Sequence, residues 1–242
     1  MIPWEGPLPD PQVRTTGEIR ALLFDPDCIA PGMLYLMYRD LARTGKERRW
    51  LSEQQLRYDI TVIPPRVLCR EYVKTKGHYH PDNPAGVGYP EVYEVLEGCA
   101  HYLLQNRDLS DIVLFSAGTG DKVIIPPGYG HVTINPSRQT LVMANLVSTA
   151  FSSDYREYET RHGAAYFELE GENFTKNPHY PDIPVLRRRG PPDTGNLLPG
   201  GPLHAMIGNE SLSFLNRPEE YDDLLSRLTE DGMQEDVCVH SS

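Results

Sequence analysis

The sequence predicts an all-β fold, built either as a sandwich or as a barrel. Between residues 58 and 148, short runs rich in β-branched and aromatic residues follow one another. Glycine, proline, asparagine or aspartate separates most of these runs, and these residues are typical of turns. Many short strands at such close spacing are typical of sandwiches and barrels. The length of 242 residues suits one large all-β domain or two small ones.

The segment before residue 58 has a mixed pattern. Residues 1–32 are rich in proline and aspartate and predict a surface arm, with one helical turn near residues 18–23. Residues 33–40 form an apolar run whose periodicity fits a strand or a buried helical turn equally well. Residues 44–49 are charged and predict a loop or a helix end. Residues 52–55 resemble a capping box, although a short loop fits them as well.

The central region predicts a series of strands with alternating apolar and polar positions. They comprise residues 58–63, 67–75, 91–96, 99–106, 111–116, 121–125, 131–135 and 140–148, with a further candidate at 164–169.

The C-terminal region is less regular. An extended polar stretch over 176–184 leads to residues 187–192, which resemble a linker and begin with three arginines. Such a charge run is more often a solvated surface than a phosphate-binding patch. Residues 202–216 predict one or two strands. Residues 218–228 predict an amphipathic helix, because a proline in the first turn precedes apolar residues at helical spacing. We expect the last ten residues, 233–242, to fray.

The composition excludes several classes of protein. A net charge of −11 argues against nucleic-acid binding, because phosphate backbones need a basic stripe. The mean hydropathy is −0.46, and no apolar run reaches the length of about 18 residues that a membrane span needs. The N-terminus lacks the basic and then apolar layout of a signal peptide. We therefore expect a soluble cytoplasmic protein with no membrane partner.

The four cysteines also favour a reducing compartment. Cys28, Cys69, Cys99 and Cys238 are widely spaced and form no CxxC pair. This spacing argues against a disulfide framework or a zinc knuckle. The sequence therefore predicts reduced thiols.

Two stretches carry candidate metal ligands. His78 and His80 are two residues apart, so on a strand both imidazoles face the same side. Glu91 opens a predicted strand, and His131 opens another after the turn Pro-Pro-Gly-Tyr-Gly. Three imidazoles and one carboxylate suit Fe, Mn, Co, Ni or Zn and leave positions open for substrate or water. Each feature alone is a weak signal, and the hypothesis depends on their combination.

The spacings in these stretches resemble the two motifs of the cupin superfamily. In the first, Glu91 is followed at the family distance by Gly98; in the second, residues 120–135 match at every position. The first motif has a longer insert than most cupins between its second histidine and its glutamate, over residues 81–90. This insert is rich in proline and glycine and predicts a hairpin loop that tolerates the extra residues.

Further sequence segments resemble those of the cupin-type glucose-6-phosphate isomerases of archaea and some bacteria. They are residues 58–65, 74–80, 91–93 and 126–131, and the resemblance covers roughly residues 33–185. It implies a jelly-roll barrel with an N-terminal arm and a C-terminal helical extension, and a strand at 33–40. It divides the chain into an arm with a first strand, a metal-binding domain and an extension with a helix near 218–228. The three parts span residues 1–57, 58–185 and 186–242.

The resemblance also implies a function. The family interconverts glucose 6-phosphate and fructose 6-phosphate, a step of glycolysis and gluconeogenesis, on one divalent transition metal per subunit and with no other cofactor. The ligands would be His78, His80, Glu91 and His131. A homodimer is expected on the same ground.

Site residues are carried over position by position. The family's phosphate-binding positions fall on Tyr35, Thr61, Thr75 and Gly77, and its catalytic positions on Glu91, Tyr93 and Tyr155.

At two positions the sequence departs from the family pattern. A family histidine falls on Ser153, which puts a proton relay there in doubt, and a family tyrosine falls on Gly128, next to Tyr129.

Several alternatives stay open at this point. Glu91 is the leading candidate for a base, but a carboxylate that binds metal tightly is a weaker base, and a hydride shift directed by the metal needs none. Another metal-dependent cupin enzyme, such as a dioxygenase or a decarboxylase, uses similar ligands. A non-catalytic sugar-binding cupin is the third alternative. The identity of the metal and activity on mannose 6-phosphate are not determined by the sequence.

Overall fold

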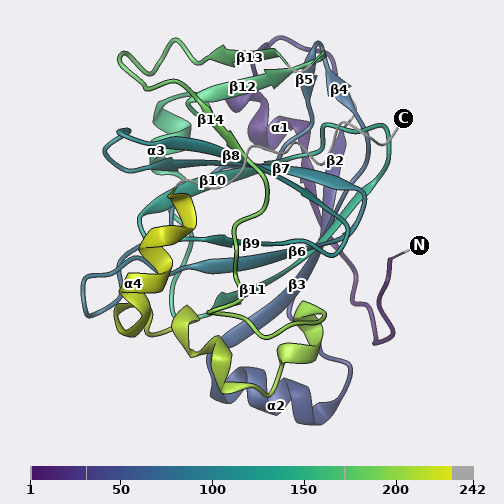
Figure 1. The fold of residues 1–242 in the computed structure, drawn as a ribbon. Helices are drawn as coiled ribbons and strands as arrows, with labels where there is room; N and C mark the ends of the chain where they lie inside the picture. The colour runs from purple at the N-terminus through teal and green to yellow at the C-terminus, as the bar shows by residue number, and fades with distance from the viewer. Residues whose placement is uncertain (1, 31, 172, 231–242) are drawn as a thin grey trace.

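Two β-sheets face one another and enclose the main core, and a third, smaller sheet lies beyond the second (Figure 1). The computed structural model of the protein describes residues 2–30, 32–171 and 173–230. The all-β class is confirmed, and the two facing sheets fit the cupin resemblance. Within the described residues the sheets are open at their edges rather than closed into a continuous barrel.

The larger sheet has six antiparallel strands and carries most of the candidate site. In spatial order they are β1 (Gln12–Thr15), β2 (Met33–Tyr38), β3 (Leu56–Ile63), β11 (Leu141–Ser148), β6 (Glu91–Glu97) and β9 (Lys122–Ile125). The register places Asn145 of β11 opposite both Asp59 of β3 and Tyr93 of β6. Side chains at such opposite positions share one face of the sheet.

The facing sheet is made of three antiparallel strands and one parallel edge strand. They are β10 (Tyr129–Ile134), β7 (Cys99–Asn106), β8 (Ile112–Gly118) and the parallel β14 (Arg187–Arg189). The third sheet contains β13 (Asn173–Lys176), β12 (Tyr166–Leu169), β5 (Glu71–Tyr72) and β4 (Val67–Leu68).

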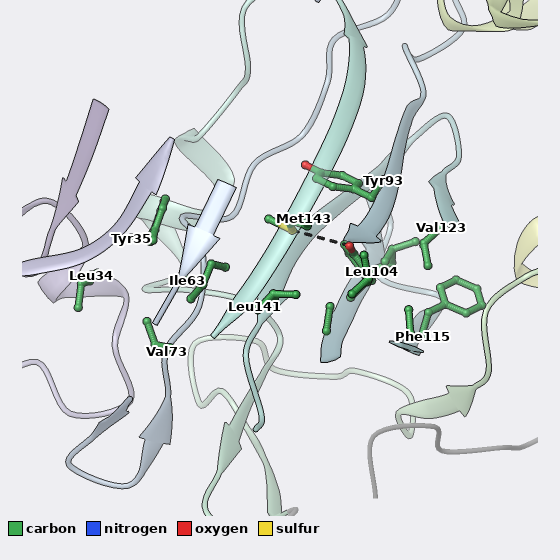
Figure 2. Close-up of a cluster of buried hydrophobic side chains, with 14 of the residues drawn as sticks. Leu34, Tyr35, Ile63, Val73, Tyr93, Leu104, Phe115, Val123, Leu141 and Met143 are labelled. Atoms are coloured by element: carbon green, nitrogen blue, oxygen red, sulfur yellow. Dashed lines mark hydrogen bonds between the residues drawn. The ribbon is translucent and has the colours of Figure 1, made fainter. Parts of the chain in front are cut away.

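The main core fills one part of the space between the two large sheets. Figure 2 shows Leu141, Met143 and Val123 from the six-stranded sheet with Leu104 and Phe115 from the facing sheet. Complete burial of such side chains contributes about 1.5–3 kcal/mol each. This apolar half anchors both sheets, so that the polar residues beside it are held at fixed positions.

The outer face of the six-stranded sheet is also covered. Ile60, Val92 and Ala144 pack there with Leu203 and Phe214 of the C-terminal segment. Every residue of β11 is buried as a result, which explains its nearly continuous apolar sequence. The short helices of this segment are α4 (Asp222–Leu225) and the 3₁₀ helices η2 (Leu203–Met206), η3 (Glu210–Leu215), η4 (Pro218–Tyr221) and η5 (Ser226–Thr229).

The structure differs from the sequence-based prediction at several short elements. The N-terminal arm contains the predicted helical turn, as α1 (Thr16–Ile19) and η1 (Arg20–Leu22), but also the unpredicted strand β1. A helix, α2 (Gly45–Glu53), occupies the segment predicted as a loop or a helix end. Its N-cap is Thr44, whose hydroxyl accepts the Glu47 amide at 3.2 Å, so of the two alternatives at residues 52–55 the capping box is wrong. The unpredicted α3 (Arg156–Thr160) follows β11 in the chain.

Three further predictions are corrected. The strand expected over 67–75 is split into β4 and β5, because Cys69 and Arg70 have φ of 50° and 113° and form a turn. Residues 187–189 are a strand and not a linker. Residues 202–216 form 3₁₀ helices instead of strands, and the predicted helix over 218–228 is present as three short consecutive pieces. The predicted frayed end, 233–242, lies outside the described residues.

The prediction of reduced cysteines is wrong for all three described cysteines, because Cys99 is disulfide-bonded as well as Cys28 and Cys69. Cys28 and Cys69 form a disulfide with their Cα atoms 5.8 Å apart. They are 41 residues apart in the sequence, so only the packing of the arm against the β4–β5 turn brings them together. Cys238 lies outside the described residues.

None of the described helices combines the length and the apolar character that crossing a membrane requires.

Candidate metal centre

All four predicted metal ligands meet at one point between the two large sheets. His78 and His80 lie in the segment between β5 and β6, Glu91 begins β6, and His131 lies in β10. Backbone hydrogen bonds join His78 and His131 in both directions, at 3.3 Å and 3.1 Å, and fix the two chains beside one another. One ligand atom from each of the four residues lies within 4.8 Å of the others.

The distances between these atoms suit a coordination sphere. The Nε2 atom of His80 is 3.2 Å from Nε2 of His78 and 3.3 Å from Oε2 of Glu91. The Nε2 atom of His131 is 3.5 Å from the same carboxylate oxygen. Ligands that each lie roughly 2.0–2.2 Å from one ion are separated by distances of this order. The donor set therefore fits a divalent transition metal.

Neighbouring groups orient the ligands. The His80 Nδ1 atom is 2.8 Å from the carbonyl oxygen of Tyr89, and an N–H there directs Nε2 toward the centre. The Asn145 side chain donates to Oε1 of Glu91 at 2.7 Å. The other oxygen, Oε2, is buried and has no hydrogen-bond partner among the described residues. A bound cation would satisfy this oxygen.

The electrostatics keep the site ready for a cation. Burial lowers the pKa of His131 to about 4, and burial together with the neighbouring imidazoles lowers the pKa of His78 well below its usual range. Although burial opposes it, contact with His80 and with the other two imidazoles lowers the pKa of Glu91 to about 2. Neutral imidazoles beside an ionised carboxylate are the protonation states that bind metal.

The centre opens into a cavity of about 510 Å³ on the inner face of the six-stranded sheet. Tyr35, Thr61 and Thr75, which were predicted to bind phosphate, line this cavity. The predicted catalytic residues Tyr93 and Tyr155 line it too. The structure therefore brings eight of the predicted site residues to one cavity: His78, His80, Glu91, Tyr93, Tyr155, Tyr35, Thr61 and Thr75. His131, the fourth ligand, does not line the cavity but completes the ligand cluster.

Gly77 differs from the other predicted site residues. It does not line the cavity, and a Cβ atom there would lie 2.2 Å from the ring of Tyr158. The absence of a side chain lets this segment pack directly on Tyr158, beside His78.

The hydroxyls of Tyr93, Tyr35 and Thr75 each have a hydrogen-bond partner within the protein. The Tyr93 hydroxyl is 3.0 Å from Nε2 of His131, and burial raises the pKa of Tyr93 well above its usual range. The Tyr35 hydroxyl accepts the Lys76 amide at 3.0 Å. The Thr75 hydroxyl accepts the Thr133 amide at 2.9 Å. The hydroxyls of Tyr35 and Thr75 act as acceptors in these contacts, so each keeps a hydrogen that it can donate to a ligand in the cavity.

The two departures from the family pattern have different surroundings. Ser153 lines the cavity, where the family has a histidine. Tyr129, next to Gly128, donates from its hydroxyl to Asp111 at 2.8 Å and does not line the cavity.

Sequence reasoning missed several cavity residues. Asn145 could have been found, because it alternates with Met143 and Val147 on a predicted strand and so shares their face. Arg14 gave no such signal, because the proline-rich arm showed no strand pattern. Arg39 and Arg57 became site residues only through the alignment of β2 and β3.

Comparisons with known proteins agree with these observations. The family described as glucose-6-phosphate isomerase (GPI) matches residues 26–184. The glucose-6-phosphate isomerases of Pyrococcus furiosus and Thermococcus litoralis are each 30% identical over 104 residues, covering 43% of this chain and 52% of the relative. The chain thus spans about half the length of the curated relatives it matches.

Solved structures with some likeness include oxalate decarboxylase from Bacillus subtilis, with a TM-score of 0.37 and 16% identity over 50% of this chain and 27% of that one. Vicilin from Corylus avellana has a TM-score of 0.39 and 14% identity, over 60% of this chain and 33% of that one. The family match covers well over half of the chain and includes all four metal-ligand candidates. The chain therefore belongs to the glucose-6-phosphate isomerase family.

Proposed function

We propose that this protein is a metal-dependent aldose–ketose isomerase that interconverts glucose 6-phosphate and fructose 6-phosphate. One observation carries the proposal: the four-ligand cluster opens into the same cavity as Tyr35, Thr61 and Thr75. A sugar phosphate needs both a centre for C1 and C2 and hydrogen-bond donors at its other end. The family membership supplies the reaction.

We propose one Fe, Mn, Co, Ni or Zn ion per subunit, bound by His78, His80, Glu91 and His131. When bound, such an ion supplies Lewis acidity at the carbonyl end of the sugar, an effect of several kcal/mol. The protein supplies the rest of the site: a carboxylate fixed by Asn145 and walls that orient the sugar.

The residues proposed as catalytic have distinct environments. The Tyr93 hydroxyl stays protonated, because burial raises the pKa of Tyr93, so it acts as a hydrogen-bond donor to the sugar oxygens. The Tyr155 ring lies 5.5 Å from the His78 ring and forms a wall beside the centre. We assign Glu91 two roles, as a metal ligand and as the carboxylate beside C1 and C2 of the bound sugar. A proton-transfer route uses Glu91 as the base, and a hydride shift needs no base.

A coupled assay with fructose 6-phosphate tests the proposal. The protein is stripped with EDTA, and Fe²⁺, Mn²⁺, Co²⁺, Ni²⁺ or Zn²⁺ is returned singly. We expect turnover to disappear with the chelator and to return with one or more ions. Binding of metal without turnover with any ion would contradict the proposal and would direct the next assay to oxygen consumption.

The same preparation distinguishes the two routes for hydrogen. The reaction is run in D₂O, and the product is examined by NMR. Deuterium at C1 or C2 would show proton exchange through a base, whereas its absence would support a hydride shift.

A homodimer remains a prediction from the resemblance, and a cytoplasmic location remains a prediction from the composition and the N-terminal sequence. Light scattering during size-exclusion chromatography tests the dimer. The Cys28–Cys69 disulfide weighs against a strongly reducing compartment, because disulfides are rare there.

A further inference from the structure

The residues proposed for the phosphate group carry no positive charge. Tyr35, Thr61 and Thr75 offer hydroxyl hydrogen bonds only, and Gly77 offers none from a side chain. A phosphate dianion that enters a partly desolvated cavity loses hydration, and an opposite charge offsets that loss better than neutral donors alone. The metal would lie at the sugar's carbonyl end. A cation at the phosphate end would therefore strengthen binding.

Three of the cavity's basic residues already have close anionic partners. Arg39 and Arg57 both bind the buried carboxylate of Asp59, at 2.6 Å and 2.9 Å. The Lys76 ammonium lies 2.6 Å from Glu159 and 4.5 Å from the centre of the Tyr155 ring.

Arg14 of β1 is the fourth basic residue of the cavity. Its Nη1 atom donates to Glu18 at 2.7 Å, but the other oxygen of Glu18 accepts the amide and the hydroxyl of Thr15 at the start of α1. The Nε atom of Arg14 is buried and has no hydrogen-bond partner among the described residues. A buried guanidinium N–H without a partner is costly, so it marks a place where an anion would be stabilised.

The position of Arg14 fits the phosphate end of the sugar. It lies opposite Tyr35 in the β1–β2 register, and the Tyr35 hydroxyl contacts the Lys76 amide at 3.0 Å. Lys76 is two residues before the metal-ligand candidate His78, roughly 7 Å along an extended chain. This span is comparable with the length of a six-carbon sugar chain.

We propose that Arg14 binds the phosphate group of the substrate and supplies the positive charge that the other phosphate-binding candidates lack. This inference rests on the proposed function. It assigns a specificity role to a residue that lies outside the family-matched region, residues 26–184. Sugars without a phosphate would gain nothing from this residue, so Arg14 would select for phosphorylated substrates.

The test compares four variants of the metal-loaded protein with the wild type. Arg14→Gln removes the charge and Arg14→Lys retains it. Glu18→Gln breaks the Arg14–Glu18 ion pair but leaves Arg14 in place. Arg138→Gln removes one exposed arginine, as a control for net charge. Calorimetric titration with inorganic phosphate measures anion binding, and the coupled assay measures KM and kcat for fructose 6-phosphate.

We expect Arg14→Gln to weaken phosphate binding and to raise KM by at least about tenfold each, the loss typical of one hydrogen bond to a charged group. The kcat should change little, because the contact is equal in ground and transition states. Arg14→Lys should recover part of the loss. Glu18→Gln should bind phosphate as well as the wild type or better, and Arg138→Gln should be unchanged.

Two results would overturn the inference. One is phosphate binding that is absent from the wild type or unaffected by Arg14→Gln. The other is a loss in Glu18→Gln equal to that in Arg14→Gln, which would show that Arg14 acts only through the ion pair. Arg14-dependent phosphate binding in a protein without isomerase activity would reject the proposed function and support the anion site. Isomerase activity with an unchanged KM in Arg14→Gln would support the proposed function and reject the anion site at Arg14.

Discussion

Glu91 shows how neighbours set the role of a single side chain. Its Oε1 atom is occupied by Asn145, while Oε2 faces the imidazoles without a hydrogen bond among the described residues. The carboxylate can therefore offer only one oxygen to a cation. Asn145 acts through Glu91 and is a positioning residue.

Replacing Asn145 should weaken metal binding. In Asn145→Ala the Glu91 carboxylate can rotate, and we expect the affinity for the metal to fall about 10- to 100-fold, as for other groups that orient a ligand. Competition with a chelator of known affinity measures the change. An unchanged affinity would show that the imidazoles alone fix Glu91.

Replacing Thr75 should separate its proposed role in phosphate binding from its structural hydrogen bond. Thr75→Ala removes the hydroxyl that we propose as a donor to phosphate and also the acceptor for the Thr133 amide, whose lost partner costs about 1–3 kcal/mol. We expect KM to rise more than kcat falls, and the melting temperature to drop. Thr75→Ser keeps the hydroxyl and should restore both. An unchanged KM in Thr75→Ala, with a lower melting temperature, would make the residue purely structural.

At the scale of elements, the central strands were predictable and the edge elements were not. β3, β6 and β11 carry long alternating or apolar runs, so the sequence itself places them within a few residues. β1 and β14 are short edge strands whose partners lie far away in sequence, on β2 and β8. Their pairing is decided by tertiary contacts, which local patterns do not contain.

The attachment of β14 has a pH dependence of known sign. Arg187 of β14 binds Asp111 with two hydrogen bonds of 2.8 Å and 2.7 Å. Burial opposes ionisation of Asp111, but these bonds, the Tyr129 hydroxyl and the arginine charge together lower its pKa below the ordinary value of 3.8. Because the carboxyl pKa is lowered in the folded state, the ion pair stabilises the fold fully above the ordinary pKa of about 3.8. This stabilisation is lost as the pH falls through the folded-state pKa.

We therefore expect the protection of residues 187–189 from hydrogen exchange, relative to the intrinsic rate at each pH, to fall below pH 4. Asp111→Asn should show faster exchange already at pH 7 and should lower the stability by about 1 kcal/mol or less, because the pair is partly exposed. The acid-dependent step should be absent from this variant. Equal protection of β14 in the variant and the wild type would show that its backbone pairing suffices.

For the molecule as a whole, the sequence predicted the metal cluster better than its surroundings. The four ligands stand at the spacings of two motifs, and it is the resemblance to the cupin family, not a local pattern, that implies that the two motifs meet. Arg14, Arg39 and Asn145 join the same cavity only because β1, β2 and β11 align in one sheet. The Cys28–Cys69 bond was missed for the same reason: spacing in sequence contains no information on the turn that brings the two residues together.

The disulfide should contribute to global stability. In the chain-entropy view, closing a loop of 41 residues stabilises the folded state by up to about 4 kcal/mol. The double variant Cys28→Ser/Cys69→Ser should therefore unfold at lower urea concentration than the oxidised wild type. Addition of a reductant should lower the stability of the wild type at least to the level of the variant, because the reductant also breaks the disulfide of Cys99. Coincident unfolding curves for all three samples would show that the bond contributes no stability.

The same bond determines what happens if the chain is cut. The closed loop from Cys28 to Cys69 contains β2, α2 and β3, and the first and last of these carry Tyr35 and Thr61 into the cavity. A protease that nicks the surface helix α2 would release no peptide, because both ends of the cut stay covalently joined. Such a nicked protein should migrate near full length on a non-reducing gel, separate into two pieces only after reduction, and keep both cavity walls assembled until then.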